Sequence, residues 1–407
     1  MRIAILDSYF NWPPSGGGIR DVKEVASGLA KKGYEPTLII PEYGSRGMIA
    51  DLNVDFEIQK LKFNKFDFTG FNLYRRVKSV LSRLQPDVVL VCNGNLLKPY
   101  MILASRKYPV IVRLYAYEFL CPLFYGLLFN DSHVCDSNYI SSPHKCIPCM
   151  YNKKYITKLN FEAIRSCSFL LPLYHCITKE SLKIPKKFIL TSDYMKKRFS
   201  EIIPIEKIEI IPSGVATDKF KPRESEKSNR EIKRIFFPSR PDDPLKGLNT
   251  LINAANILWK QRRDFRILVT GNTNINIEKY PFLIQESWKS EDEICSTYAT
   301  SDFAVVPSLW AEPFGLAALE AMSSGIAVIA SQTGGLPDFI EDGKTGILVP
   351  PRDYEALASK MDELLDDEGY RLRLGIEARK HSLQYSWHNI INEYVSVIEQ
   401  VSSENHV

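Results

Sequence analysis

The sequence predicts an α/β protein with two doubly wound domains, each a parallel sheet covered by helices. Three observations predict this fold. The first fifty residues alternate strand, glycine loop, helix and strand. The same alternation restarts after a polar segment at Thr217–Arg234. A chain of 407 residues typically holds two or three domains. A strand–helix–strand crossover forces the two strands to pair in parallel.

The first domain is predicted at residues 1–212. A short apolar strand at Arg2–Leu6 is followed by a loop of Pro, Ser and Gly at Asn11–Gly18 and by helical spacing at Ile19–Lys32. Gly33 then ends the helix, and the next strand is expected at Tyr34–Ile40. Further strands are predicted at Val88–Cys92, Val110–Leu114, Lys187–Thr191 and Ile208–Pro212.

The second domain is predicted at residues 213–385. Its helices are expected over Leu248–Lys260 and from about Phe314. Its strands are expected at Ile235–Pro238, Phe265–Gly271, Phe303–Pro307, Ala327–Ala330 and Gly346–Val349. Ligands of doubly wound sheets bind beyond the carboxyl ends of the strands. With two such sheets, we expect the site in a cleft between the domains.

The composition excludes several classes of protein. Lys and Arg total 52 against 48 Asp and Glu, a net charge of +4, which is too mild for a nucleic-acid-binding surface. The hydrophobic fraction of 45% is the globular average and excludes disorder. Eight Cys in a chain of this length make no secreted disulfide framework. Because the sequence contains neither a signal peptide pattern nor a long apolar run, we expect a cytoplasmic protein.

The densest motif is PSLWAEPFGLAALEAMSSGIAVIASQTGGLPDFIEDGKTGILVP at residues 307–350. Glu312 and the Pro-Phe-Gly after it are expected to open a helix, with Pro313 in its first turn. The amides around Gly315–Ala317 and the positive end of the helix dipole can bind an anion. Glu320 lies roughly 12 Å from Glu312 along an ideal helix, whereas the paired carboxylates of a retaining glycosidase lie about 5–5.5 Å apart. The two carboxylates suit opposite ends of one elongated ligand, although each alone is also an ordinary helix residue.

Two other loops follow predicted strands. Arg240 and Lys246, in SRPDDPLKG, can neutralise a diphosphate, Arg through its planar fork and Lys as a point charge. Gly17 and Gly18 belong to a Ser-Gly-Gly-Gly loop after the first strand, where a backbone can approach a phosphate or sugar closely. This loop is not the dinucleotide fingerprint, and no acid follows at the required spacing, which counts against an NAD oxidoreductase.

Together these motifs resemble the retaining glycosyltransferases of family 4, which have the GT-B fold of two Rossmann-like domains facing a central cleft. The resemblance extends over nearly the whole chain, including IIPSGVATDKFKP at the domain junction and the terminal YSWHNIINEYVSVIEQ. In that family the terminal helix crosses back to the first domain, so we assign residues 386–407 to the first domain.

The resemblance implies transfer of a sugar from a nucleotide-sugar donor with retention of configuration, and no metal or other cofactor for catalysis. Arg240 and Lys246 match the cations that bind the diphosphate. Glu312 matches the carboxylate that holds hydroxyls of the donor sugar, and Glu320 the one that binds the ribose. Catalysis then rests on electrostatic stabilisation of the departing diphosphate.

Backbone groups complete the site that the resemblance implies. Phe314, Gly315, Leu316 and Ala317 match the turn whose amides meet the phosphate and sugar. Gly17 and Gly18 match the first-domain loop that faces the diphosphate and the acceptor. The expected acceptor is a carbohydrate or lipid-linked glycan in polysaccharide or glycoconjugate synthesis, and neither donor nor acceptor is specified further.

One departure from the family pattern concerns a histidine. Many relatives have a His shortly before the Cys-Pro that is Cys121-Pro122 here, but this chain reads VIVRLYAYEFLCP. Arg113, Tyr117 or Glu118 could take the role of this His, or the group could be an ordinary strand-end cluster.

Four cysteines form a second constellation. Cys121, Cys135, Cys146 and Cys149 lie within thirty residues, the last pair as CIPC. They are predicted to hold a structural zinc, with buried reduced thiols or disulfides as the alternatives.

Residues 60–83, KLKFNKFDFTGFNLYRRVKSVLSR, contain seven Lys or Arg, one acid and five aromatic residues. This composition suits peripheral contact with an anionic membrane surface on the inner face of the membrane. The alternative is a solvated amphipathic helix that packs its aromatic residues inward.

Three other functions stay open at this point. The chain could be a catalytically silent GT-B module that binds sugar nucleotides, a sugar-nucleotide epimerase of the same fold, or the NAD oxidoreductase already disfavoured. The transferase is favoured over the silent module because all four charged residues of the family motif are present, namely Glu312, Glu320, Arg240 and Lys246.

Overall fold

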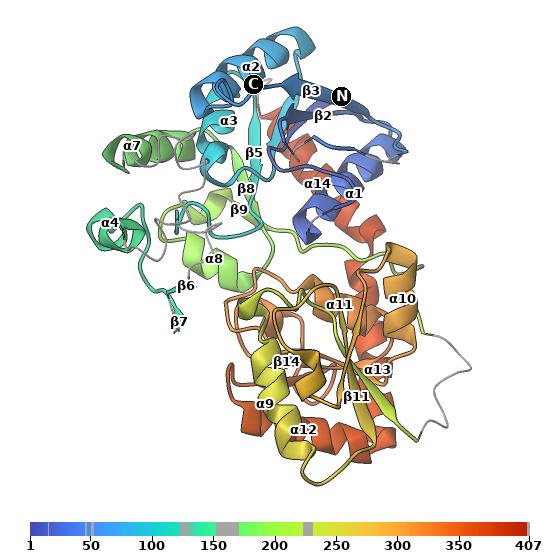
Figure 1. Ribbon diagram of the computed structural model, residues 1–407. Helices are drawn as coiled ribbons and strands as arrows, with labels where there is room; N and C mark the ends of the chain where they lie inside the picture. Colours follow the sequence, from blue (N-terminus) through green and yellow to red (C-terminus); the bar gives the residue numbers. More distant parts are fainter. Residues whose placement is uncertain are drawn as a thin grey trace. The chain divides into compact units, whose positions relative to one another are not determined.

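The computed structural model describes the chain apart from residues 15, 45–46, 50–52, 123–128, 131–132, 152–170, 223–230 and 405–407. The chain divides into two compact units (Figure 1). The first unit comprises residues 1–130, 134–212 and 388–407, and the second comprises 131–133 and 213–387.

The first unit is built on a parallel sheet of seven strands in the order β3-β2-β1-β4-β5-β8-β9. Its strands are β1 (Arg2–Leu6), β2 (Glu35–Glu42), β3 (Glu57–Lys62), β4 (Val88–Val91), β5 (Val110–Arg113), β8 (Lys187–Leu190) and β9 (Ile208–Ile210). The described helices are α1 (Gly17–Lys31), α2 (Gly70–Leu84), α3 (Lys98–Ala104), α4 (Pro143–Tyr151), α7 (Leu171–Leu182) and α8 (Asp193–Phe199). A small two-stranded sheet pairs β6 (Phe129–Asn130) with β7 (His133–Val134).

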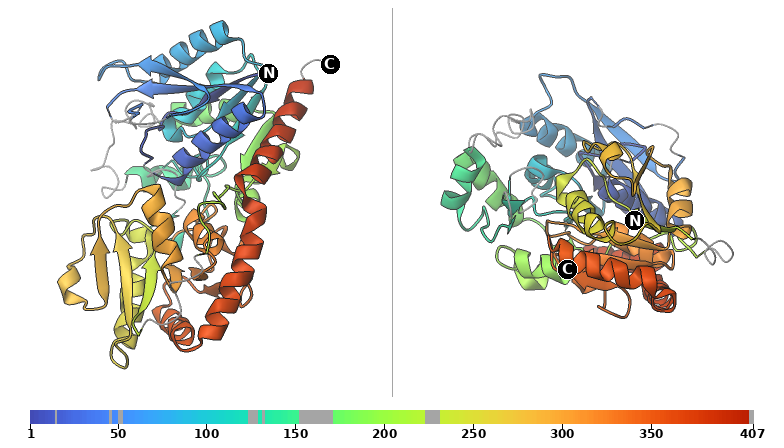
Figure 2. Two further views of the ribbon diagram at one scale, coloured as in Figure 1. Left: turned by 90° about the vertical axis from the view of Figure 1, so that its right-hand side faces the viewer. Right: turned by 60° about the horizontal axis from the view of Figure 1, so that its bottom comes forward.

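The last helix, α14 (Trp387–Ser403), belongs from His388 onward to the first unit. Tyr34 Oη donates to Glu399 Oε1 at 2.6 Å. A Cβ on Gly28 in α1 would lie 2.4 Å from the Ile391 side chain, so only glycine lets the two helices approach this closely. The red ribbon of α14 lies beside this unit in Figure 2.

The second unit has a parallel sheet in the order β12-β11-β10-β13-β14-β15. Its strands are β10 (Lys233–Phe237), β11 (Phe265–Thr270), β12 (Leu283–Glu286), β13 (Phe303–Val306), β14 (Ala327–Ser331) and β15 (Ile347–Val349). Its helices are α9 (Leu248–Leu258), α10 (Glu291–Ala299), α11 (Leu316–Ser323), α12 (Tyr354–Asp366) and α13 (Glu368–Ser382).

Alternation along β10 explains why helices cover both faces of this sheet. Ile235 and Phe237 point to a core shared with α9 and α12, whereas Phe236 points to a core shared with α11. Both faces are buried, so the strands read as continuous apolar runs. The prediction of two doubly wound parallel sheets is confirmed.

Besides the short β6 and β7, two strands of the main sheets were not predicted from the sequence. β3 reads EIQKLK and β12 reads LIQE, and each lies at the edge of its sheet, where most side chains are exposed or only half-buried. An edge strand needs no apolar run, so its pattern is weak.

Candidate functional site

The strand order of the second unit fixes where a ligand can bind. Numbered from its own first strand, the sheet has the order 3-2-1-4-5-6. The chain therefore leaves β10 and β13, which are neighbours, toward opposite faces, and a crevice opens beyond their carboxyl ends. The loop after β10 carries Arg240 and Lys246, and the loop after β13 carries Glu312.

Lys246 and Glu312 meet at this edge of the sheet. Lys246 Nζ lies 2.7 Å from Glu312 Oε1, and Ser308 Oγ donates to the same oxygen at 2.7 Å. The Lys246 ammonium also lies 5.2 Å from the centre of the Trp310 ring, within reach of a cation–π interaction. The Glu312 side chain is 8% exposed and that of Lys246 is 21% exposed. The pair is thus largely desolvated but still open on the lysine side.

Local sequence holds Lys246 in place. Asp243 caps the short turn Pro244–Lys246 by accepting from Leu245 N at 3.0 Å. Gly247 follows with φ +80, and a Cβ there would lie 1.9 Å from the Pro307 carbonyl oxygen. Only glycine permits this close approach of the β10 loop to the β13 loop.

The backbone of Glu312 is held by the loop after β14. Gly335 N donates to Glu312 O at 2.7 Å. Gly334 has φ +59, and a Cβ there would lie 2.2 Å from Glu312 O and 2.4 Å from Glu312 N. Three strands therefore contribute to the position of this one carboxylate. Ser308, Trp310 and Gly334 were not identified from sequence, because their roles depend on contacts between loops.

The helix after Glu312 begins later than predicted. α11 starts at Leu316, with Gly315 as its N-cap at φ +116. Pro313 therefore lies in the preceding loop and not in a first helical turn, and the ideal-helix separation of Glu312 and Glu320 does not apply. The expectation fails because Gly315 adopts a left-handed conformation, which no helical residue shares. Ala318 N and Leu319 N donate to Gly315 O, so the amides of Leu316 and Ala317 are the first-turn donors that a bound anion could use.

The side chain of Phe314 has a structural role. It is buried, and its ring centre lies 4.7 Å from that of Phe339 and 5.8 Å from that of Tyr385. Only the backbone of Phe314 is therefore available to a ligand.

Glu320 lies in the second turn of α11 and is half-buried. The buried Tyr298 of α10 donates through Oη to Glu320 Oε2 at 2.9 Å and contacts Ala317 O at 3.0 Å. Tyr298 thus orients the carboxylate, another role that depends on packing between helices. Burial, with Glu320 as the next cause, raises the pKa of the neighbouring Cys295 thiol to about 12.

Arg240 is placed differently from Lys246. Its guanidinium donates to Asp243 Oδ2 at 2.9 Å, and 52% of its side chain is exposed. The structure thus brings Lys246 and Glu312 together but leaves Arg240 on the solvent side of the same loop.

The first unit has its own switch point between β1 and β4. α1 begins at Gly17, two residues earlier than predicted, so Gly17 and Gly18 form its first turn. Asn93 follows β4 and donates through Nδ2 to Asp7 Oδ2 at 2.7 Å. If Gly18 had a Cβ, this atom would lie 3.0 Å from the Asn93 side chain. Burial raises the pKa of Asp7 to about 6, although hydrogen bonds from Tyr9 and Asn93 oppose the shift.

The three residues considered as substitutes for the missing histidine belong to the core of the first unit. Arg113 is fully buried and stacks over Tyr394 of α14, with 5.7 Å between guanidinium and ring centre. Glu118 pairs with the buried Lys98 at 2.5 Å, and Tyr117 stacks on Phe199. This placement favours the strand-end cluster over a catalytic role.

The four cysteines of the predicted zinc site are all described and partly buried, and none forms a disulfide with another described residue. Burial raises the pKa of Cys146 to about 11, and Cys135 and Cys149 contribute to the shift. Across the described ranges, however, no three Cys, His, Asp or Glu side chains converge in a way that could hold a metal. The described geometry does not fit a metal at Cys121, Cys135, Cys146 and Cys149, so the zinc site stays a prediction without geometric support.

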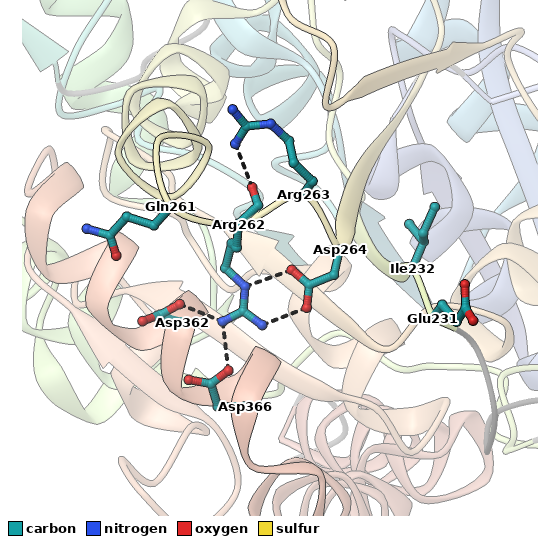
Figure 3. Close-up of a pocket in the computed structure, with 8 residues that line it drawn as sticks. All are labelled: Glu231, Ile232, Gln261, Arg262, Arg263, Asp264, Asp362 and Asp366. Carbon is teal, nitrogen blue, oxygen red and sulfur yellow. Dashed lines mark hydrogen bonds and ion pairs between the residues drawn. The ribbon is translucent and has the colours of Figure 1, made fainter.

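A pocket elsewhere in the second unit lies at the amino ends of its strands, opposite the carboxyl ends that carry the candidate site (Figure 3). Arg262 lies at its centre and pairs with Asp264, Asp362 and Asp366 at 2.7–2.8 Å. Asp264 immediately precedes β11, so this network lies at the amino ends of the strands. It ties α12 to the loop before β11 and takes no part in the candidate site.

Known proteins resemble this chain in sequence. Residues 218–381 match the family model of the glycosyl transferases group 1. An MMP alpha-(1->4)-mannosyltransferase from Mycolicibacterium hassiacum is 33% identical over 208 residues, which are 48% of this chain and 49% of that protein. The chain thus spans about half the length of the first curated relatives it matches. An uncharacterized glycosyltransferase of Methanocaldococcus jannaschii is 26% identical over 98% of this chain and 97% of its own.

A solved structure shows the same fold. The Anabaena protein HepE in complex with UDP-glucose aligns with a TM-score of 0.68 at 15% identity, over 98% of this chain and 100% of that chain. The chain therefore has the GT-B fold of glycosyltransferases. The residues that match the glycosyl transferases group 1 family model, 218–381, lie within the second unit.

Proposed function

We propose that this protein is a glycosyltransferase that moves a sugar from a nucleotide-sugar donor to an acceptor with retention of configuration and without a metal. The observation that carries the proposal is the Lys246–Glu312 pair, desolvated at the switch point of a GT-B nucleotide-binding unit. A lysine and a carboxylate so placed can bind the two sides of the bond that breaks, the lysine the phosphate and the carboxylate the sugar.

Each group has a proposed task. Lys246 and Ser308 both hydrogen-bond to Oε1 of Glu312, which leaves Oε2 to accept from a hydroxyl of the donor sugar. The Lys246 ammonium has three donors and can bind the diphosphate while it keeps Glu312. The amides of Leu316 and Ala317 face the same anion at the start of α11. Glu320, oriented by Tyr298, accepts from the ribose hydroxyls.

Catalysis follows from the charge that develops on the leaving diphosphate. As the glycosidic bond breaks, negative charge grows on the phosphate oxygens, and fixed donors stabilise it without reorganising. The acceptor hydroxyl attacks from the side that the diphosphate leaves, and a phosphate oxygen takes its proton. Arg240 is exposed before the donor binds, so we propose that it turns from Asp243 to the diphosphate in the complex.

The substrate class is proposed at a coarse level. HepE is solved with UDP-glucose, which supports a nucleotide sugar as the donor. The mannosyltransferase relative and the D-inositol 3-phosphate glycosyltransferase of Corynebacterium glutamicum, 31% identical over 206 residues, support a hydroxylated acceptor. We propose a carbohydrate or lipid-linked glycan and a role in glycoconjugate synthesis at the cytoplasmic face of a membrane.

The first experiment is a thermal-shift panel with UDP-, GDP- and ADP-sugars against NAD. One sugar nucleotide is expected to raise the Tm and NAD to leave it unchanged. Release of nucleotide from the stabilising donor, with or without added glycans and in the presence of EDTA, then measures turnover. Stabilisation by NAD alone would refute the proposal. Donor binding with no transfer to any acceptor would favour a silent module, and a changed sugar on intact donor would favour an epimerase.

Variants test the two carboxylates separately. Glu320→Ala is expected to weaken binding of bare nucleotide and of donor about tenfold, the cost of a charged hydrogen bond. Glu312→Ala is expected to spare bare nucleotide and to abolish transfer. Glu355→Ala, an exposed glutamate of α12, is the matched control. Equal loss of nucleotide affinity in both site variants, measured by calorimetry, would contradict the assigned roles.

A further inference from the structure

The outward face of α2 in the first unit is the surface that no part of the proposed function uses. We propose that this face, defined by Phe66, Phe71, Arg75 and Lys78, docks on the surface of an anionic lipid bilayer. The inference rests on the membrane association in the proposed function, for which it names the surface, and its test does not depend on transferase activity.

Helical spacing puts three of these residues on one stripe. Phe71, Arg75 and Lys78 follow at intervals of four and three, so they lie on one side of α2. The opposite side is the apolar one, with Leu73, Val77, Val80 and Leu81 buried, and α2 packs against α3 (Figure 1). The stripe therefore faces away from the core of the unit.

Two aromatic rings of this segment are exposed to solvent. The sequence had left open that they pack inward. Phe66 is 89% exposed and Phe71 is 64% exposed. Phe68, by contrast, is buried, and Phe63 lies under the Arg76 guanidinium at 4.2 Å. The aromatic residues of this segment are thus divided, and the exposed pair lies at the start of α2.

Phe66 is held outward by a rigid turn. Asn64 Oδ1 accepts from Phe66 N at 2.9 Å and from Asp67 N at 3.0 Å. Asp67 pairs in turn with Arg76 of α2 at 2.5 Å, and Asn72 Nδ2 donates to Asp67 O at 2.9 Å. Because the turn is tied to the helix, exposure of the Phe66 ring is built into the fold.

The charge on this face has one sign. α2 contains four cations and no Asp or Glu. Asp67, the one acid of residues 60–83, is paired with Arg76. Arg75 and Lys78 lie beside the Phe71 and Tyr74 rings at 6.0 and 5.7 Å, and neither has an ion pair with a described residue. Cations beside protruding rings can bind lipid phosphates while the rings enter the boundary of the acyl chains.

The proposed contact is peripheral. Throughout the described residues, no helix is long and apolar enough to cross a bilayer. A protein partner would need an acidic surface with pockets for two rings, whereas a bilayer with anionic lipid offers both negative charge and an apolar layer that the exposed rings can enter. We therefore commit to the lipid surface.

The test is co-sedimentation of the full chain with vesicles of phosphatidylcholine, with and without phosphatidylglycerol. We expect binding only to the anionic vesicles, weakened by raising the salt from roughly 0.05 to 0.5 M. Arg75→Gln and Lys78→Gln together are expected to weaken binding about thirtyfold, about fivefold per cation. Phe66→Ser with Phe71→Ser is expected to weaken it at least tenfold at either salt concentration.

A matched control separates this face from general surface effects. Ile376→Ser with Lys380→Gln removes one exposed apolar residue and one exposed cation, one turn apart on α13, and is expected to bind as the unaltered chain does. Unchanged binding in the α2 variants, binding to phosphatidylcholine alone, or no binding at low salt would each overturn the proposal. All the altered side chains are exposed, so thermal unfolding verifies that the variants remain folded.

Discussion

The Lys246–Glu312 pair makes a quantitative prediction about stability, because removal of one partner leaves the other poorly compensated. Lys246→Met keeps the apolar length of the side chain and removes its charge. Glu312, 8% exposed, then keeps only the hydrogen bond from Ser308 Oγ. Breaking a fully buried pair costs about 3–5 kcal/mol. Lysine is 21% exposed here, so solvent screening lowers the expected cost to about 2 kcal/mol.

The reverse change is expected to cost less. In Glu312→Gln the side chain still accepts a hydrogen bond from Ser308, and the Lys246 ammonium can turn to solvent. We therefore expect the free energy of unfolding to fall by about 1 kcal/mol. The double variant is expected to lose about 1.5 kcal/mol less than the sum of the single losses, because the pair is broken only once. For a unit of this size, the Lys246→Met change lowers the Tm by roughly 4–8 °C.

Urea unfolding followed by tryptophan fluorescence measures these changes. Trp259, Trp288, Trp310 and Trp387 belong to the second unit and Trp12 to the first, so the signal reports mainly on the second unit. Additive losses, within about 0.4 kcal/mol, would refute the reasoning that the two side chains stabilise one another. A similar stability of Lys246→Met and the unaltered chain would also refute it.

Three further predictions concern single features of the fold. As the pH rises from about 4 to 7, the free energy of unfolding of the Asp7→Asn variant is expected to increase by about 3 kcal/mol relative to that of the unaltered chain. Burial raises the pKa of Asp7 to about 6, so the folded chain holds a proton that the unfolded chain releases, and stability falls as pH rises through this range. A pH-independent difference in urea midpoints would contradict this. Gly334→Ala is expected to destabilise the second unit by about 3 kcal/mol, because its Cβ would meet the Glu312 backbone at 2.2 Å. Gly343→Ala, also at positive φ but with its nearest neighbour 4.0 Å away, is the control and is expected to lose about 1 kcal/mol; equal losses would show that the clash is relieved cheaply. Finally, elemental analysis of protein purified without added metal tests the zinc prediction. Because the four thiols do not converge in the described geometry, we expect all of them to titrate with a thiol reagent, and one tightly bound zinc per chain would show that the cysteines rearrange around a metal.

The parallel sheets were predictable because both faces of each central strand are buried. β1, β4, β10 and β13 are short apolar runs separated by helices, and this pattern has few other solutions. The edge strands β3 and β12 were not predictable, since half-exposed strands carry little periodicity. The start of α11 was predicted wrongly, because Gly315 adopts a left-handed conformation that the local pattern does not reveal; a Cβ there would also lie 2.5 Å from the Leu336 side chain.

The sequence by itself determined the class of fold and the residue types of the candidate site. These depend on local pattern and on motif spacing, which the chain carries without reference to long-range contacts. Only the tertiary structure decided which side chains meet. It joined Lys246 to Glu312 across two loops, added Ser308, Trp310 and Tyr298 to the site, and turned Phe66 and Phe71 outward while it buried Phe68. Such choices depend on distances between segments far apart in the chain, and periodicity contains no information about those distances.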